Sequence, residues 1–156
     1  HAGEIARDYV VLCHGWLPPV REDINARVYE SKSGCSVEIS WRGRPSGTSL
    51  KVLAHSAYRG AAFSLVVVRI KTGRMHQIRV HTAHIAHPTV CDGRYTAVAT
   101  FKPDSTWCPR NFLHRHRLAF WDDGGRATEA LAPLPSDLKA ALLQLSSRDR
   151  ESAEEL

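Results

Sequence analysis

The sequence predicts one compact domain in which β-strands and helices are combined. Its 156 residues are 43% hydrophobic and 24% charged, which is enough for a single core but not for two. Short β-rich or alternating segments predict strands, and two other segments repeat apolar residues at the spacing of a helix. This composition excludes a disordered tail and a fibre.

Five strands are predicted along the chain. They lie at residues 5–13, 35–41, 48–55, 61–71 and 112–121. Tyr58-Arg59-Gly60 joins the third and fourth strands into a hairpin, and residues 42–47 form a basic, turn-rich stretch before it. In the last strand, alternation places Leu113 on the face opposite Leu118.

Two helices are predicted. The first follows the Thr72-Gly73 break, begins near Met75 and ends before Pro88, which gives about three turns. The second has Ser136 as its N-cap, and its apolar residues recur at positions 138, 141, 142 and 145. Residues 96–110 are predicted to be irregular. Residues 147–156 are polar and are predicted to fray as a tail, so that residues 1–146 form the folded unit.

Positive charge is concentrated in the middle of the chain. Residues 31–118 hold 14 basic and 3 acidic side chains, a net charge of +11 within a total of +5. Sixteen of the 21 basic residues are Arg, whose planar guanidinium binds phosphates in a bidentate manner and stacks on bases. The charge favours an anionic polymer as partner, and an ordinary solvated surface is the alternative.

The sequence favours a reducing compartment inside the cell. The cysteines are Cys13, Cys35, Cys91 and Cys108. They contain no C-x-x-C pair, so neither a disulfide framework nor a zinc ribbon fits, and we expect free thiols. No apolar run approaches the roughly 18 residues that cross a bilayer, and the first ten residues lack the features of a secretory signal. Cytoplasm, nucleus and organelle all stay open.

Residues 72–88, TGRMHQIRVHTAHIAHP, are the most informative segment, because so many Arg, His and Gln residues are unusual on a short structural helix. The segment resembles the TGR-x-HQIR-x-H-x-AHIGHP signature of the RluA-type pseudouridine synthases. Residues 92–95, DGRY, resemble the family's GD-x-x-Y step. Residues 5–15, IARDYVVLCHG, are similar to its K-x-Y-x-A-x-V-x-G strand, and FLHRHRLAF with APLPSDLKAAL is similar to its C-terminal strand and helix.

The resemblance implies a fold and a reaction. The fold is an α+β domain with a mixed, mainly antiparallel sheet, flanking helices and an RNA-binding cleft. The reaction isomerises uridine in RNA to pseudouridine without a metal or an organic cofactor. A catalytic Asp attacks the nucleotide, the glycosidic bond breaks, and the uracil turns and reattaches through carbon 5. The target nucleotide must leave its stack to react.

The family's nucleophile motif, H-R-L-D-x-x-T-S-G, has no counterpart here, since the only Arg-Leu pair, Arg117-Leu118, precedes Ala119. The chain begins with His1, and the resemblance starts within a few residues of it. We therefore expect residues 1–146 to be the C-terminal portion of a catalytic domain whose Asp lies upstream, and the fragment alone to be inactive. A non-catalytic RNA-binding module derived from the fold is the main alternative.

The resemblance assigns catalytic roles to three residues. Arg79 is at the position that pairs with the catalytic Asp, and its charge would keep that carboxylate ionised. Without the Asp in this chain, we expect its guanidinium to face water, a phosphate or a bound anion. Tyr9 is at the position that stacks on the uracil; proton transfer is also proposed there, but a phenol is a poor base at neutral pH. Leu113 matches an aliphatic residue packed against the base. The structural alternatives are a surface arginine, a core tyrosine and a core leucine.

RNA contacts are expected from a further group of residues. They are Arg7, Arg42, Arg44, Arg74, His76, Gln77 and His81. Arg7 replaces the family's Lys, and the last four either meet the phosphate backbone or hold the helix against its neighbours. By charge alone, Lys51, Arg59, Arg69 and Lys71 are also candidates. A zinc site in the histidine-rich run is disfavoured, since no carboxylate or cysteine pair completes it.

The expected partner is RNA, ribosomal or transfer, with no membrane and no nucleotide cofactor. A piece of a catalytic domain can expose an apolar sheet edge, so self-association is a further expectation. A basic domain that binds acidic protein surfaces is a weaker rival, and it predicts no preference for RNA over another polyanion of equal charge.

Overall fold

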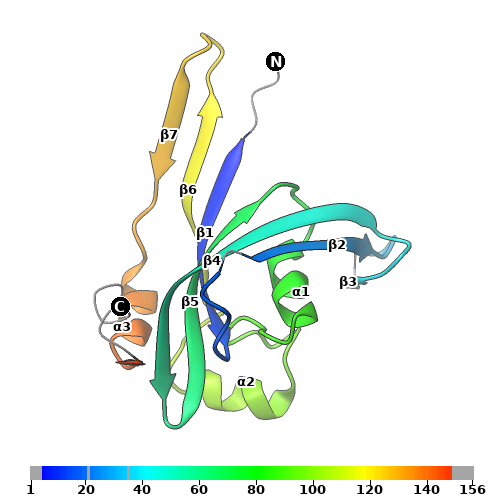
Figure 1. Ribbon diagram of the computed structural model, residues 1–156. Coiled ribbons are helices and arrows are strands. Elements are labelled where there is room, and N and C mark those ends of the chain that lie inside the picture. Colours follow the sequence, from blue (N-terminus) through cyan, green and yellow to red (C-terminus); the bar gives the residue numbers. More distant parts are fainter. Residues whose placement is uncertain (1–4, 21, 35, 149–156) are drawn as a thin grey trace.

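The computed structural model describes residues 5–20, 22–34 and 36–148. Its eight strands are β1 (Ala6–His14), β2 (Glu22–Glu30), β3 (Val37–Ile39), β4 (Arg44–Tyr58), β5 (Ala61–Ile70), β6 (Leu113–Trp121), β7 (Ala127–Leu131) and β8 (Ser146–Ser147). Its three helices are α1 (Gln77–His84), α2 (Val98–Asp104) and α3 (Ser136–Leu142). The predicted α+β class is confirmed (Figure 1).

The strands form one sheet in the order β3-β2-β4-β5-β1-β6-β7, with β8 paired to β4. Every pairing between described strands is antiparallel, so this part of the sheet is antiparallel rather than mixed. The predicted hairpin is its centre. Arg59 and Gly60, at φ of 48° and 81°, make the two-residue turn between β4 and β5, a geometry that matches the twist of the two strands.

Both faces of the central strands are covered. On one face, Val11, Val66 and Ile78 belong to a core that packs beneath α1. On the other face, Leu12 and Leu65 pack with Leu138 of α3 in a second core. Successive side chains of β1 therefore point alternately into the two cores. This explains why three consecutive residues of that strand, 11 to 13, are fully buried.

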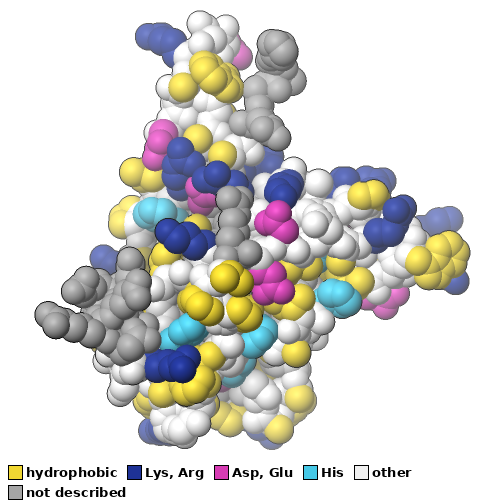
Figure 2. Space-filling model, viewed as in Figure 1, with side chains coloured by type: hydrophobic (Ala, Val, Ile, Leu, Met, Phe, Trp, Pro, Cys, Tyr) yellow, Lys and Arg dark blue, Asp and Glu magenta, His cyan; other side chains and the backbone are white. Residues whose placement is uncertain are grey.

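Two arms extend from this body. The hairpin of β6 and β7 projects at one end, and the strands β2, β3 and β4 extend sideways over α1 (Figure 1). Lys and Arg side chains are spread over the face shown in Figure 2 and gather toward the far end of the β2–β3–β4 arm.

Several predicted boundaries were wrong. Strands β2, β7 and β8 were not predicted, and four of the six residues of the expected turn at 42–47 belong to β4, which begins at Arg44. Residues 96–110 contain α2, with Pro103 in its last turn. Helix α1 has only eight residues, and α3 begins at Ser136 after Pro135, so Ser136 is not the N-cap.

The predicted tail is partly ordered. Ser147 pairs with Ser56 of β4, and the Arg148 N–H donates to the His55 carbonyl at 2.9 Å. Residues 149–156, the rest of the expected tail, lie outside the described residues. None of the helices in the described ranges is long and apolar enough to cross a membrane.

A β-bulge in β6 corrects the predicted alternation. The partners of Asp8 and Tyr9 in β1 are Arg117 and Arg115, so His116 is an extra residue between them. Leu113 pairs with Val11 and Leu118 pairs with Arg7, two positions on the same face of β1. Leu113 and Leu118 therefore share a face, because one inserted residue reverses the alternation beyond it.

Candidate active site

A cleft of about 510 Å³ opens where β1 and β6 meet the start of α1. Its lining residues are Tyr9, Ile70, Arg74, His76, Gln77, Ile78, Arg79, Arg110, Asn111, Leu113 and Arg115. The three residues to which the sequence assigns catalytic roles, Arg79, Tyr9 and Leu113, all belong to this set. They come from α1, β1 and β6, which are distant in the chain, so only the fold brings them together.

Arg79 makes a bidentate ion pair with Asp92. Its Nε donates to Asp92 Oδ2 at 2.7 Å and its Nη2 donates to Oδ1 at 2.6 Å. The Asp92 side chain has no exposed surface, and that of Arg79 is 22% exposed. Burial acts to raise the pKa of Asp92, but the hydrogen bond from Arg79 and those from two backbone N–H groups outweigh it, and the pKa is lowered. The pair is therefore ionised at neutral pH.

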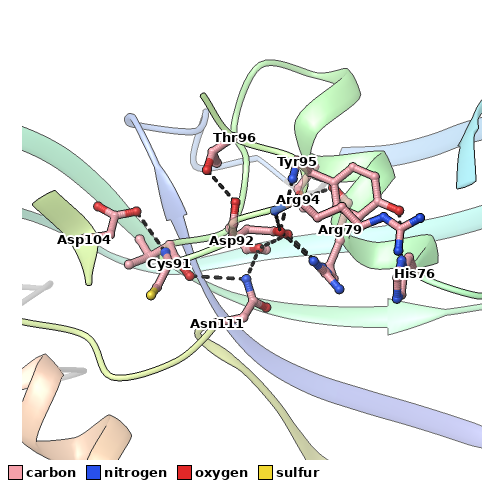
Figure 3. A network of polar contacts seen from close by, with 12 residues as sticks. His76, Arg79, Cys91, Asp92, Arg94, Tyr95, Thr96, Asp104 and Asn111 are labelled. Carbon is pink, nitrogen blue, oxygen red and sulfur yellow. Dashed lines mark hydrogen bonds and ion pairs between the residues drawn. The ribbon is translucent and has the colours of Figure 1, made fainter. Parts of the chain in front are cut away.

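The loop that carries Asp92 is itself fixed (Figure 3). Oδ1 accepts the backbone N–H groups of Arg94 and Tyr95 at 3.0 and 3.2 Å, and Thr89 donates its hydroxyl to Oδ2 at 3.2 Å. Just before Asp92, Cys91 adopts a left-handed backbone at φ 55°, a conformation that is strained for a side chain other than glycine. Asp92 thus has a fixed orientation before any ligand binds.

The expectation that Arg79 faces water, a phosphate or a bound anion needs correction. Two of its three guanidinium nitrogens are held by Asp92, and sequence reasoning missed this partner. A hint was present, because Asp92 is one of only three acidic residues in the basic segment 31–118. Nη1 has no hydrogen bond to any residue of the described ranges, and Arg79 still lines the cleft.

Tyr9 lies beside Arg115, a residue that was not predicted to belong to the site. The two are partners across β1 and β6, and Arg115 Nε donates to the Tyr9 hydroxyl at 3.2 Å. The guanidinium carbon lies 5.5 Å from the centre of the Tyr9 ring. Leu113, two residues earlier on β6, packs against the core that includes Tyr9. Arg115 lies before the bulge, so regular alternation places it on the same face as Leu113, and that alternation could have identified it.

His76 closes one side of the cleft. Its Nδ1 lies 2.9 Å from the Tyr95 hydroxyl, and the two rings meet edge to face. Burial lowers the pKa of His76, and the nearby charges of Arg79 and Arg94 lower it further. His76 is therefore neutral at pH 7 and acts as a hydrogen-bonding group rather than as a cation.

Gln77 and His81 hold the helix in place, which corrects their predicted contacts with phosphate. The Gln77 amide donates to the Gly47 carbonyl at 2.9 Å and to Thr48 Oγ1 at 3.0 Å, and its oxygen accepts the Thr72 hydroxyl at 2.7 Å. His81 is fully buried, and its Nε2–H donates to the Ala26 carbonyl at 3.2 Å. Neither side chain is accessible to an RNA strand, so the structure supports their other predicted role.

The predicted cationic residues do not all lie at the cleft. Arg74 lines it and also lines a second groove of about 390 Å³, together with Arg42 and Arg44. Arg7 shares the Tyr9 face of β1 and lines a separate apolar hollow with Leu118 at the base of the β6–β7 hairpin. The candidates thus extend from the cleft along two directions, toward each arm of the molecule.

No cysteine side chain lines the cleft within the described residues. Cys13, Cys91 and Cys108 are free and buried, and Cys35 lies outside the described residues. Burial raises the pKa of Cys13 and of Cys108 to about 12, so both thiols are protonated at neutral pH. They act as small apolar residues of the cores.

Comparison with known proteins agrees with this geometry. A family model described as RNA pseudouridylate synthase matches residues 1–84. Ribosomal large subunit pseudouridine synthase C of Haemophilus ducreyi is 34% identical over 148 residues, 90% of this chain and 44% of that protein. An uncharacterized RNA pseudouridine synthase of Chloroflexus aurantiacus is 37% identical over 107 residues, 68% of this chain and 31% of that protein.

A solved structure, human RNA pseudouridylate synthase domain containing 1, superposes on the chain with a TM-score of 0.77 at 26% identity. The match covers 97% of this chain and 65% of that one. The chain spans less than half the length of the curated relatives named above. The matched family model covers more than half of the chain, and the fold agrees along nearly all of it, so the chain belongs to the RluA-type family of RNA pseudouridine synthases.

Proposed function

We propose that the protein containing this chain isomerises uridine to pseudouridine in RNA. The observation that carries the proposal is that Tyr9, Leu113 and Arg79 line one cleft, although they lie on three different elements. An aromatic ring and an aliphatic side chain beside a guanidinium suit a flat, uncharged base whose sugar is attacked by a carboxylate. The chain's membership of the family supports the same reaction.

The proposed chemistry balances without a cofactor. We expect the catalytic Asp to lie in the chain upstream of His1. Its carboxylate attacks the nucleotide, and the bond from the sugar to uracil N1 breaks. The freed uracil turns within the cleft and bonds to the sugar through carbon 5. Carbon 5 then loses its proton, N1 gains one, and the carboxylate is released.

Each cleft residue has a proposed role in this reaction. Tyr9 stacks on the uracil while it turns, and Leu113 packs against the base. The free Nη1 of Arg79 meets the catalytic carboxylate, and Asp92 fixes the guanidinium for that contact. The positive charge of Arg79 keeps the catalytic carboxylate ionised. Because Asp92 orients the Arg79 guanidinium, this effect does not depend on the substrate.

The substrate is proposed to be ribosomal or transfer RNA. The name of the Haemophilus ducreyi relative points to the large ribosomal subunit for that protein, which makes ribosomal RNA the first substrate to test. Phosphate contacts are proposed for Arg7, Arg42, Arg44 and Arg74, with a hydrogen bond from His76.

Self-association, expected from the sequence, is checked by sedimentation in the same buffer before affinities are compared.

The test is tritium release from RNA labelled at carbon 5 of uridine, because the isomerisation exchanges that atom's hydrogen. We expect the full protein to release tritium from ribosomal RNA and the 156-residue chain alone to release none. Replacement of Arg79 by Gln in the full protein should abolish release while RNA still binds. Catalysis by the chain alone would show that the nucleophile lies within it, contrary to our assignment.

A non-catalytic RNA-binding module is the second candidate. It is favoured by one observation: no acidic side chain lines the cleft within the described residues. The coding sequence upstream of His1 separates the two candidates. An Arg-Leu-Asp triplet there supports the enzyme, and its absence together with RNA binding but no tritium release supports the module.

A further inference from the structure

We propose that the groove beside the turn between β3 and β4 is a second RNA site, in which Arg42, Arg44 and Arg74 bind the phosphodiester of an unpaired nucleotide and Trp41 stacks on its base. The inference rests on the proposed function, because the nucleotide belongs to the same RNA strand that delivers uridine to the cleft. It adds a base contact on an arm of the molecule that lies outside the cleft.

The groove and the cleft share one lining side chain. Its lining residues are Val28, Tyr29, Glu30, Ser31, Arg42, Gly43, Arg44 and Arg74, and Arg74 also lines the cleft. The Arg74 Nε is buried and has no hydrogen-bond partner within the described ranges. A buried donor without a partner is unfavourable, and a phosphate oxygen would satisfy it. One arginine can thus hold the strand where it leaves the cleft.

The arginines of the groove are available to bind a phosphate, whereas two arginines of the cleft are already paired with carboxylates. In the cleft, Arg79 is neutralised by Asp92 and Arg110 by Asp137. Arg42, Arg44 and Arg74 form no ion pair with a carboxylate in the part of the chain that the structure describes. Glu30 is the one acidic residue that lines the groove, so three guanidinium groups face a single carboxylate. The local excess of positive charge suits a phosphodiester.

Trp41 is displayed at the far end of the same arm. It is 80% exposed, although burying an indole is favourable, and the Arg42 guanidinium carbon lies 5.4 Å from its ring centre. Figure 2 shows hydrophobic and basic side chains together at the far end of this arm. An exposed indole beside arginines is a stacking platform of the kind that binds single-stranded nucleic acid.

The turn that carries Trp41 is anchored on both sides. The Gly43 N–H donates to the Ser40 carbonyl at 2.8 Å, and Arg27 Nε donates to the Gly43 carbonyl at 2.8 Å. A Cβ at Gly43 would lie 2.4 Å from the Val28 carbonyl carbon, so the turn packs directly on β2. The backbone of the turn is therefore held in place, which lowers the entropy that the turn loses on binding.

A base-bearing polyanion is the ligand that these features favour. The arginines alone would accept any phosphate chain or an acidic protein surface. The indole of Trp41 distinguishes between these partners. It adds binding free energy by stacking on an unpaired base, and it adds little with a strand that has no bases. The stacking partner is expected to be an unpaired nucleotide, since the bases of a duplex expose no face to an approaching ring.

The experiment measures binding of the full protein to a fluorescein-labelled 15-nucleotide oligouridylate by anisotropy, over a series of salt concentrations. We expect Trp41→Ala to weaken binding at least about fivefold, with an unchanged salt slope. The double variant R42Q/R44Q should lower the salt slope by about 1.4 to 1.8, the effect of two phosphate contacts. Trp41→Phe should lie between wild type and Trp41→Ala, because a smaller aromatic ring still stacks.

Matched controls come from the opposite end of β4. Trp16 is 46% exposed there, and the Arg148 guanidinium carbon lies 4.2 Å from its ring centre. Trp16→Ala and Arg148→Gln remove the same residue types from another surface, and we expect both variants to bind like wild type. Inorganic polyphosphate is the base-free probe. Trp41→Ala should leave its binding unchanged, whereas R42Q/R44Q should weaken it.

The outcomes separate this inference from the proposed function. If the wild-type protein releases tritium but Trp41→Ala and R42Q/R44Q bind the oligonucleotide like wild type, the second site is wrong and the enzyme assignment stands. If Trp41→Ala weakens polyphosphate as much as RNA, or if polyglutamate displaces RNA at equal charge, base stacking is wrong. If the wild-type protein neither binds RNA nor releases tritium, the proposed function itself fails.

Discussion

At the scale of single residues, the most consequential feature is that Arg79 is oriented by the protein itself. The bidentate contact with Asp92 fixes two of its guanidinium nitrogens, and the Asp92 carboxylate is in turn held by backbone N–H groups. A buried carboxylate that accepts five hydrogen bonds, the fifth from Thr89, is ionised and immobile. The guanidinium of Arg79, which lines the cleft, is thereby positioned with little freedom.

Removing the Asp92 charge should destabilise the protein. In Asp92→Asn, the Arg79 guanidinium is left partly buried without its counter-ion, and we expect the free energy of unfolding to fall by about 3 kcal/mol. The control is Lys71→Gln, which breaks the Lys71–Asp23 pair, because both of its side chains are well exposed. That change should cost less than about 1 kcal/mol. Urea unfolding followed by circular dichroism measures both, and equal effects would contradict the assignment.

The role of Tyr9 can be separated into stacking and proton transfer. Tyr9→Phe keeps the ring but loses the hydroxyl that accepts the hydrogen bond from Arg115. If stacking is the role, we expect Tyr9→Phe to retain kcat within about tenfold, and Tyr9→Ala to lose far more, since general acid–base catalysis contributes roughly 10²–10⁴-fold. Tritium release by the full protein gives both rates. A loss in Tyr9→Phe as large as that in Tyr9→Ala would instead identify the hydroxyl as the group that moves a proton.

Sequence reasoning found some site residues and missed others for physical reasons. Arg79, Tyr9 and Leu113 were found because they lie within continuous motifs. Asp92 was recognised as part of a motif but not as the partner of Arg79, since an ion pair across 13 residues depends on how the loop folds back. Alternation places Arg115 on the face of Leu113, but it was missed because its contact with Tyr9 depends on how β6 pairs with β1.

At the scale of elements, α1 is fixed to the sheet by buried polar side chains. Gln77 connects the start of the helix to β4, and His81 connects its second turn to β2. The apolar contribution of the helix is small by comparison, with Ile78 and Val80 as its fully buried apolar residues. The position of Arg79 between these contacts explains why a short helix can hold a reacting group steady.

His81 should make the stability of the protein depend on pH. Burial lowers its pKa below the ordinary value of 6.5, and its Nδ1 has no partner to receive a second proton within the described residues. The unfolded chain therefore binds the proton more readily than the folded one. The stability that His81 contributes is complete above pH 6.5 and is lost as the pH falls through the folded pKa, at no more than about 1.4 kcal/mol per pH unit.

His81→Gln keeps an N–H donor for the Ala26 carbonyl but does not titrate, so we expect its free energy of unfolding to change less between pH 7 and pH 5 than that of wild type. His84→Gln is the control, because His84 lies on the exposed side of the same helix, although its charge also lowers the pKa of His81 slightly. Urea titrations at several pH values measure the slopes. Equal slopes in wild type and His81→Gln would assign the pH dependence to another group.

The elements that sequence reasoning found are those with strong local patterns. The β4–β5 hairpin has two β-rich segments around a glycine turn, and α1 follows a clear break. Strand β2 was missed because polar residues alternate with few apolar ones along an edge region of the sheet. Helix α2 was missed because Pro103 argues against a helix, yet a proline is tolerated here in a helix of seven residues.

At the scale of the whole molecule, the fold redistributes charge in a way that the sequence does not reveal. Arginines of the basic segment 31–118 form ion pairs with carboxylates from both flanking segments. Asp8 pairs with Arg69 and Arg117, and Asp137 pairs with Arg110. These contacts neutralise arginines on one part of the surface. The arginines that line the cleft, the groove or the hollow and have no carboxylate partner in the described ranges are Arg7, Arg42, Arg44, Arg74 and Arg115.

This redistribution corrects the use of charge alone to choose RNA contacts. Arg69 was a candidate by charge, but Asp8 accepts two hydrogen bonds from it, at 2.6 and 2.8 Å, and holds its pKa above the ordinary value. A phosphate would have to displace that carboxylate. Arg115 has no such competitor, because its described partner is a neutral hydroxyl. Phosphate neutralisation is therefore expected at Arg115 and not at Arg69.

The salt dependence of RNA binding tests this difference. We expect Arg115→Gln to reduce the slope of log K against log salt by about 0.7 to 0.9, the effect of one phosphate contact, and Arg69→Gln to leave it unchanged. Arg69→Gln is a matched control, since Asp8 keeps Arg117 as a partner and the sheet keeps its ion pair. Anisotropy titrations of the oligouridylate between 50 and 200 mM salt give both slopes, a range over which one contact changes affinity by about threefold. If Arg69→Gln lowers the slope as much as Arg115→Gln, the ion pair with Asp8 opens to admit a phosphate, and the distribution of charge in the free protein does not determine where RNA binds.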